Sequence, residues 1–234
     1  MLEVTQLQSF YGDSQILHGI DLKVGAGERV AVLGRNGAGK TTLMKSIMNG
    51  GPSTQGRIAW QGKDLGRMAG FARTRLGLSL VPEDRRIFAH LTAVENLQIA
   101  EHAVPKGKRA VTPDEMIRHF PMLDPLRSRY GNQLSGGQQQ LLAVARGLVP
   151  MPALLLLDEP TEGLAPIIVA QMAESINAIC QERDVALLLA EQNLWFARQC
   201  TRYVHVLDAG WLVFSGTWAE FDAQPDVKNR HLAE

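Results

Sequence analysis

The sequence has few of the features that mark secreted, membrane-spanning or disulfide-stabilised proteins. Only two of its 234 residues are cysteines, Cys180 and Cys200, which fits a reducing cytoplasm. The first residues lack the basic and apolar regions of a signal peptide. The longest apolar run, residues 147–157, is interrupted by Pro150 and Pro152 and is shorter than the roughly 18 residues that a spanning helix needs. We therefore expect a soluble protein that is not exported.

No charge of one sign dominates the chain. Its 24 basic and 24 acidic residues give a formal net charge of zero, so bulk electrostatics attract neither nucleic acid nor an anionic bilayer. We expect no nucleic acid partner. The six histidines show no HxxxH or HExxH spacing, so a histidine–cysteine metal cage has no ligand set. With 45% hydrophobic and 21% charged residues, the chain has the composition of one domain or of two tightly joined subdomains.

The order of predicted elements is that of an α/β fold. Alternating residues 20–24 predict antiparallel β-structure, which leads into a buried strand at 29–33 and a helix over 41–48. Residues 84–149 are mostly helical around a loop at 105–108, which indicates a helical insertion. The other expected elements are a strand near Ile58 and Trp60, a strand at 153–157, a helix through Ile168 and Ile179, a strand at 185–190, and a hairpin of 203–207 with 211–214. Such alternation indicates a mainly parallel sheet that binds ligands beyond the carboxyl ends of its strands.

A glycine-rich loop follows the strand at 29–33. Gly34–Thr41 fits the pattern G-x-x-x-x-G-K-[ST] and lies between a predicted strand and a predicted helix. In this motif the loop amides and the helix N-terminus hold phosphates, Lys40 reaches the terminal phosphates, and the Thr41 hydroxyl binds Mg²⁺. The expected ATP-binding residues in this loop and helix are Gly34, Asn36, Gly37, Ala38, Gly39, Lys40, Thr41 and Thr42.

Two carboxylates stand where a second buried strand ends. Four leucines run into Asp158 and Glu159. An aspartate at this position can hold Mg²⁺ or its water, and the glutamate after it can polarise an attacking water. A solvated acidic turn is the alternative, which the apolar strand and Pro160 disfavour. No NKxD motif is present, so the expected nucleotide is ATP rather than GTP.

A second possible anion site lies at Ser135–Gln138. A serine and two glycines precede a helical stretch over residues 139–149, as at a helix N-terminus that binds phosphate. One nucleotide seldom needs two such cradles from one chain. The economical interpretation is a head-to-tail pair in which Ser135, Gly136, Gly137 and Gln138 of one chain close on the ATP held by the other.

These three motifs resemble the Walker A, signature and Walker B motifs of ABC-transporter nucleotide-binding subunits. The resemblance covers the whole chain and implies one nucleotide-binding domain over residues 1–234: a P-loop NTPase core, an N-terminal antiparallel β subdomain and a helical subdomain at roughly 84–149. It also implies that Tyr11 stacks on adenine, with a tyrosine buried in the sheet as the alternative. Glu83 takes the Q-loop position as a Mg²⁺ candidate, and residues 84–92 border the groove for a permease's coupling helix.

Three further segments resemble one of the two ATPase subunits of branched-chain amino-acid importers: Val81–Phe88, Glu159–Pro166 and Glu191–Asn193. They also depart from the general ABC pattern, because Glu83 replaces a glutamine, Ala165 the D-loop aspartate and Gln192 the switch histidine. Gln192 can hydrogen-bond a γ-phosphate but cannot carry a proton as imidazole does. We therefore expect a subunit that binds ATP well and hydrolyses it slowly.

The resemblance implies a peripheral ATPase on the cytoplasmic face of the inner membrane. Glu159, Lys40 and Gln192 are the expected catalytic residues, and Thr41, Glu83 and Asp158 the expected Mg²⁺ site. The expected partners are a second ATPase subunit, identical or different, two transmembrane permease subunits and, indirectly, an extracytoplasmic solute-binding protein. Two alternatives stay open: the ATPase of an exporter, and an ABC ATPase without a permease, which needs a coiled coil or second cassette that 234 residues do not hold.

Overall fold

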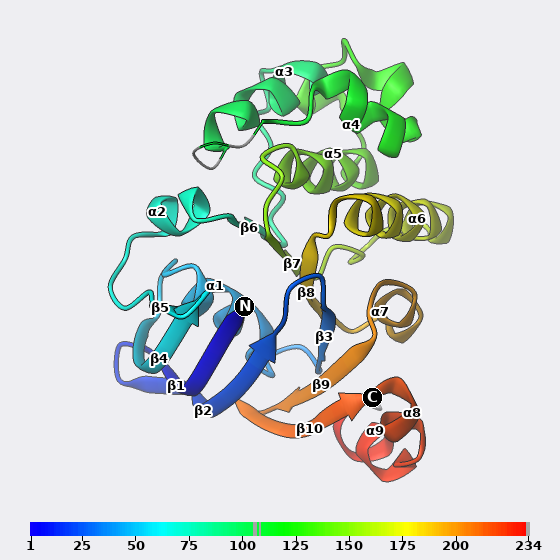
Figure 1. Ribbon diagram of the computed structural model, residues 1–234. Coiled ribbons are helices and arrows are strands. Elements are labelled where there is room, and N and C mark those ends of the chain that lie inside the picture. The colour runs from blue at the N-terminus through cyan, green and yellow to red at the C-terminus, as the bar shows by residue number, and fades with distance from the viewer. Residues whose placement is uncertain (105–106, 108, 233–234) are drawn as a thin grey trace.

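The computed structural model describes residues 1–104, 107 and 109–232, and it contains two β-sheets with flanking helices (Figure 1). The first is antiparallel, in the order β2-β1-β4-β5, with β1 at Leu2–Tyr11, β2 at Ser14–Val24, β4 at Ser53–Trp60 and β5 at Lys63–Asp64. The second has the order β10-β9-β3-β8-β7-β6, with β3 at Arg29–Leu33, β6 at Leu78–Val81, β7 at Leu154–Asp158, β8 at Ala186–Glu191, β9 at Tyr203–Asp208 and β10 at Trp211–Thr217. All its neighbouring strands are parallel except β10 and β9, so the predicted α/β class is confirmed.

The helices cover the larger sheet and build a separate helical layer. They are α1 (Lys40–Ile47), α2 (Gly70–Arg75), α3 (Ala93–Gln98), α4 (Pro113–His119), α5 (Gly136–Leu148), α6 (Pro166–Arg183), α7 (Leu194–Cys200), α8 (Trp218–Asp222) and α9 (Pro225–His231), with 3₁₀ turns η1 (Ile99–Ala103), η2 (Pro121–Leu126) and η3 (Gly131–Gln133). In Figure 1 the layer from α3 to α5 stands above the sheets. Along the described residues, these helices are too short or too polar to cross a lipid bilayer.

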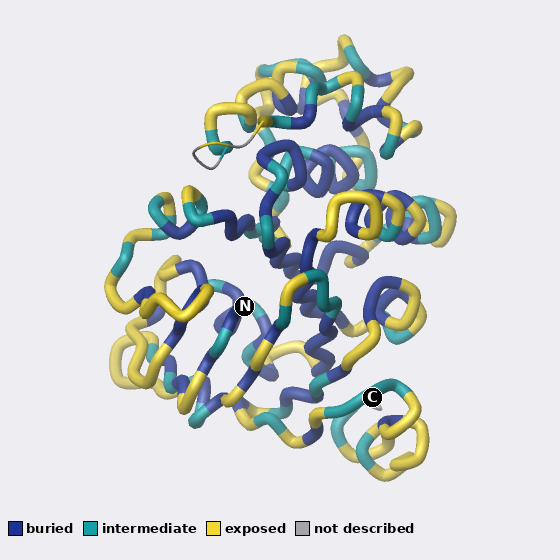
Figure 2. Tube along the Cα trace, in the orientation of Figure 1, coloured by how far each residue is buried: buried dark blue, intermediate teal, exposed yellow. Residues whose placement is uncertain are grey.

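The leucine-rich strands are buried on both faces. Leu155 and Leu157 of β7 belong to the core shared with α5 and α6, whereas Leu154 and Leu156 belong to the core shared with α1 and the antiparallel sheet. Successive side chains of a strand point to opposite faces, so a strand covered on both sides needs a continuous apolar run. Figure 2 shows these central strands as buried, with the exposed residues on the outer helices and loops.

The register of the larger sheet brings the predicted motifs to one edge. Leu33 pairs with Glu191, Asp158 with Ala190, and Val81 with Leu157. The residues that follow these four parallel strands therefore meet beyond their carboxyl ends. This register, which no pattern in the sequence specifies, brings the glycine-rich loop, Glu159, Gln192 and Glu83 together.

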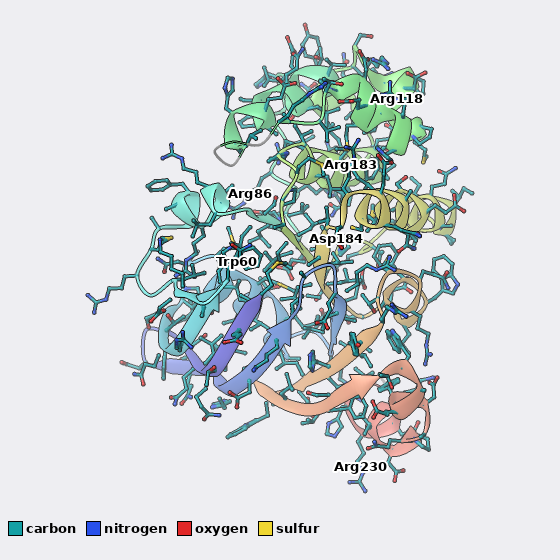
Figure 3. All side chains as sticks on the ribbon, viewed as in Figure 1. Trp60, Arg86, Arg118, Arg183, Asp184 and Arg230 are labelled. Carbon is teal, nitrogen blue, oxygen red and sulfur yellow. The ribbon has the colours of Figure 1, made fainter. Side chains whose placement is uncertain are left out.

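Several elements were not predicted from the sequence. β1 carries register shifts after Val4, Leu7 and Ser9, which interrupt the alternation that would mark it as a strand. β6 has four residues, and α8 and α9 are also short. Trp60 at the end of β4 is buried and its indole nitrogen donates to the carbonyl of Leu76 at 3.0 Å, which links the antiparallel sheet to the segment before β6 (Figure 3). Of the predicted loop at 105–108, residues 105, 106 and 108 lie outside the described residues.

Candidate nucleotide-binding site

The glycine-rich loop joins β3 to α1 and encloses the side chain of Lys40. Gly37 and Gly39 have φ of 81° and 107°, which glycine adopts at little cost. Lys40 Nζ is buried and donates to the carbonyls of Gly34 at 2.6 Å and Arg35 at 2.9 Å. It also lies 3.0 Å from Glu159 Oε1. The lysine is therefore held at the base of the loop, with its charge balanced by the carboxylate after β7.

A hollow of about 340 Å³ opens over this loop. It brings together most of the predicted nucleotide-site residues; the residues that line it are Tyr11, Ile16, Asn36, Gly37, Gly39, Lys40, Thr41, Thr42, Glu83 and Glu159. Tyr11 is 43% exposed at the end of β1, so the alternative that it is buried in the sheet is wrong. Gly34 and Ala38 lie behind this surface and are buried.

Of the predicted Mg²⁺ residues, Thr41 and Glu83 line the hollow, and Asp158 is buried beside Thr41. The Thr41 hydroxyl donates to Asp158 Oδ1 at 3.1 Å, and burial raises the pKa of Asp158 to about 6. Burial and the neighbouring carboxylates Glu162 and Glu159 raise the pKa of Glu83. A hydroxyl and clustered carboxylates are the oxygen donors that Mg²⁺ prefers, and a divalent cation would relieve their repulsion. The donor set therefore fits Mg²⁺.

This donor set is not a complete metal cage. No group of three or more His, Cys, Asp or Glu side chains in the described part of the chain is arranged to hold an ion alone. Mg²⁺ is commonly bound by one or two carboxylates together with waters and substrate phosphates. The arrangement is therefore one in which nucleotide and ion would bind together.

Gln192 does not line the hollow itself but contacts two residues that do, Asn36 and Glu159. Its amide nitrogen donates to Asn36 Oδ1 at 2.7 Å and to Glu159 Oε2 at 2.7 Å. Both oxygens of Glu159 thus have a partner, one in Lys40 and one in Gln192. Glu159 itself has φ of 45°, a strained conformation for a residue with a side chain. The Glu159 carboxylate is therefore oriented by its backbone and by two contacts, from Lys40 at the start of α1 and from Gln192 directly after β8.

The second predicted anion cradle lies away from this hollow. The Ser135 hydroxyl accepts from the Gln138 amide at 3.3 Å and the Ser135 amide donates to Gln138 Oε1 at 2.9 Å, which caps α5. A Cβ on Gly137 would lie 2.7 Å from Ile168 Cδ1, so the start of α5 packs closely against the start of α6 and a larger residue would make the Ile168 side chain shift. Ser135–Gln138 do not line the hollow over the glycine-rich loop. A single chain therefore presents the two cradles separately.

The chain is similar to known proteins in sequence and in fold. The profile described as "ABC transporter" matches residues 17–162. The chain is 36% identical to the high-affinity branched-chain amino acid transport ATP-binding protein BraG of Pseudomonas aeruginosa over 99% of each chain. It is 33% identical to a probable branched-chain amino acid transport ATP-binding protein, LivF of Archaeoglobus fulgidus, over 93% of this chain and 92% of that one. The chain belongs to the ABC transporter family. A solved ATP-binding subunit of an ABC transporter superposes with a TM-score of 0.82 at 26% identity, over 99% of this chain and 96% of the other.

One buried residue of this ABC ATPase was missed as a site residue. Glu191 accepts hydrogen bonds from the Thr161 hydroxyl at 2.6 Å and amide at 3.1 Å, and from the amides of Gln192 and Asn193, both at 2.8 Å. Burial raises its pKa and these hydrogen bonds oppose the rise. Glu191 thus ties the loop after β7 to the loop after β8. A carboxylate directly after an apolar strand was the available signal, as at Asp158.

The segment predicted to border a permease groove has two kinds of apolar residue. Ile87 is partly buried against the main core, whereas Phe88 is 46% exposed with the Arg146 guanidinium 5.4 Å above its ring. Phe88, Ile99 and Arg146 line a hollow of about 270 Å³ between α5 and the segment after β6. In this ABC ATPase, Phe88 and not Ile87 therefore faces a surface that a partner can reach.

Proposed function

We propose that this chain is the ATP-binding subunit of an importer for branched-chain or related amino acids. The observation that carries the proposal is the 36% identity to BraG, which extends over 99% of both chains. The working complex would contain a second ATPase subunit, two permease subunits and an extracytoplasmic solute-binding protein. The chain would lie peripherally on the cytoplasmic face of the inner membrane, with the hollow beside Phe88 turned towards the permease.

ATP would bind across the hollow over the glycine-rich loop. Adenine would stack on the exposed ring of Tyr11, and the phosphates would accept from the loop amides and from Lys40. Thr41, Asp158 and Glu83 would hold Mg²⁺, which supplies neutralisation of the phosphate charge when it is bound. Ser135–Gln138 of the facing subunit would cover the γ-phosphate with a second helix N-terminus.

The contacts of Glu159 indicate how hydrolysis would be prepared. Lys40 and Glu159 compensate each other's buried charge. A γ-phosphate offers Lys40 a stronger partner, so Glu159 Oε1 is released while Gln192 keeps Oε2 in place. The released oxygen can then accept a hydrogen bond from a water aligned with the γ-phosphate.

The first test separates nucleotide binding from hydrolysis. Lys40→Ala should abolish detectable ATP binding because it removes the buried cation that the phosphates need. Glu159→Gln should keep ATP binding and lose steady-state hydrolysis, because an amide cannot polarise the water as a carboxylate does. Nucleotide affinity and phosphate release measured on both variants check this; a Glu159→Gln protein with the wild-type rate would remove Glu159 from its assigned role.

The direction of transport and the class of solute need a cellular test. Uptake of labelled leucine by cells that carry Glu159→Gln in place of the wild-type chain should fall to the level of cells that lack the gene. Genes for two permeases, a second ATPase and a periplasmic binding protein beside this one are also expected. Normal leucine uptake combined with a defect in exporting a lipid would instead support the exporter alternative.

A further inference from the structure

Two large apolar side chains are exposed at the starts of neighbouring helices. Ile167, the second residue of α6, is 63% exposed, and Trp195, the second residue of α7, is 50% exposed. Neither side chain lines the hollow over the glycine-rich loop, which we call the nucleotide hollow. Exposed apolar side chains beside a functional site are typical of an interface.

Ile167 is held next to the second anion cradle, Ser135–Gln138, of its own subunit, which we call the signature cradle. A Cβ on Gly137 would meet Ile168 Cδ1 at 2.7 Å and Leu164 Cδ2 at 3.6 Å, so the start of α6 packs directly against the start of α5. The loop before Ile167 contains Ala165, whose side chain can make no hydrogen bond across an interface. Wherever the signature cradle docks, Ile167 docks with it.

A hollow of about 330 Å³ lies on the other side of the glycine-rich loop from the nucleotide hollow. It is lined by Gly34, Arg35, Asn36, Gln192, Leu194 and Leu232. Leu194 comes directly before Trp195, and α9 is held beside β9 by His231, whose Nδ1 lies 2.6 Å from Asp208 Oδ2. The hollow thus has leucine side chains from α7 and from the residue after α9, with the polar loop opposite.

The two hollows share Asn36. We propose that in the ATP-bound dimer Ile167 of each subunit packs into this second hollow of the other copy, against Leu194 and Leu232 and beside Trp195. This inference rests on the proposed function, because the signature cradle has to cover the partner's nucleotide. When it does so, the adjacent start of α6 reaches the adjacent hollow, and the two-fold symmetry repeats the contact.

The charges at the rim fit the same arrangement. Arg35 is exposed on the rim of the second hollow, and Glu162 is exposed in the loop that precedes Ile167. An apolar centre with a polar, oppositely charged rim is the common composition of a specific interface. The apolar contact would supply the dimer stability that Ala165 cannot supply through a side-chain hydrogen bond.

The test measures the ATP-dependent dimer in the Glu159→Gln background, where ATP is not consumed. Ile167→Asp should raise the monomer–dimer dissociation constant at least about tenfold, because each copy would bury a carboxylate in place of an apolar side chain. ATP affinity of the monomer and thermal stability should stay unchanged. Phe71→Asp is the matched control, since Phe71 is a 68% exposed apolar residue on α2, and it should leave the dimer intact.

Ser135→Arg separates this inference from the proposed function. If Ser135→Arg abolishes the dimer and Ile167→Asp does not weaken it, the packing of Ile167 is wrong and the shared nucleotide site stands. If the dimer survives both substitutions, the shared site itself is wrong. If the Glu159→Gln parent forms no dimer with ATP, a second copy is not the occupant and the inference is overturned.

Cross-linking tests the contact directly. Burial raises the pKa of both native thiols, Cys180 and Cys200, to about 12, so they are poor targets for a maleimide. A protein with Ile167→Cys and Trp195→Cys should be joined into a covalent dimer by a short bismaleimide with ATP and Mg²⁺, and not with ADP. Phe71→Cys combined with Trp195→Cys should give no such product. A dimer that forms on a sizing column yet gives no cross-link would contradict the proposed packing.

Discussion

Individual polar side chains at the candidate site of this ABC ATPase contact one another. Lys40 is paired with Glu159, and Gln192 joins Glu159 to Asn36 with two hydrogen bonds of 2.7 Å. A buried charge without a partner is costly, so these contacts stabilise the arrangement of the site. Since Gln192 is neutral, it can position Glu159 but shares no positive charge with the transition state.

Gln192→His tests whether this neutrality limits turnover. Histidine should raise kcat, by up to about 10²-fold, because it adds an acid–base or charge interaction confined to the transition state. The Kd for ATP should change little. Parallel measurement of kcat and Kd for wild type and Gln192→His checks this, with Gln192→Ala as the control that removes the hydrogen bonds to Asn36 and Glu159 without adding an imidazole. An unchanged or lower kcat with an unaltered Kd would mean that glutamine does all that histidine would.

Among the elements, α5 begins at the second predicted anion cradle. Its N-terminal amides follow a serine cap and two glycines, and Arg85 lies against Gly136, where a Cβ would meet its Nη1 at 3.0 Å. The cap keeps the helix start open, and the absence of side chains at Gly136 and Gly137 keeps it accessible to a phosphate.

Ser135→Arg should separate binding from dimer formation. The added side chain would occupy the place of the facing γ-phosphate, so the ATP-dependent dimer should be lost while the monomer still binds nucleotide. Size-exclusion chromatography in the Glu159→Gln background with ATP, beside a nucleotide-binding assay on the same protein, measures both quantities. An undisturbed dimer peak would count against a site completed in trans.

In the transporter that we propose, two surfaces of the chain would have to act together. The carboxyl edge of the larger sheet carries the predicted nucleotide site, and the hollow beside Phe88 lies between the helical layer and the segment after β6. Arg85 and Arg146 connect them: Arg85 lies against Gly136, and the Arg146 guanidinium donates to the Arg85 carbonyl at 3.1 Å while it covers the Phe88 ring. A movement of α5 can therefore reach both surfaces.

Phe88→Asp should uncouple ATP hydrolysis from solute transport. Because Phe88 is exposed, the isolated subunit should keep its ATPase activity and its thermal stability, whereas solute uptake by the assembled complex should stop. Ile87→Asp is the matched control, and it should lower the thermal stability because Ile87 packs against the core. Loss of stability in isolated Phe88→Asp would show instead that Phe88 belongs to the core.

The α/β class, the glycine-rich loop and the carboxylates after the leucine strand could all be predicted from the sequence. These features are local: the loop needs its glycines and lysine in order, and a strand buried on both faces needs a continuous apolar run. α1, at Lys40–Ile47, β8, at Ala186–Glu191, and the C-terminal hairpin lie within a few residues of the predicted elements. The short or irregular elements, β1 and β6, could not be predicted because their patterns are brief or interrupted by register shifts.

Which distant residues meet depends on the folded chain and could not be predicted from the sequence. The parallel register of β3, β8, β7 and β6 places Gln192 within hydrogen-bonding distance of both Asn36 and Glu159, and it gives Glu191 its role between two loops. The folded chain also packs Ile87 against the core while it leaves Phe88 exposed. Ile167 and Trp195 are exposed as well. A linear pattern fixes neither strand order nor exposure, because both depend on contacts between segments that are far apart in the chain.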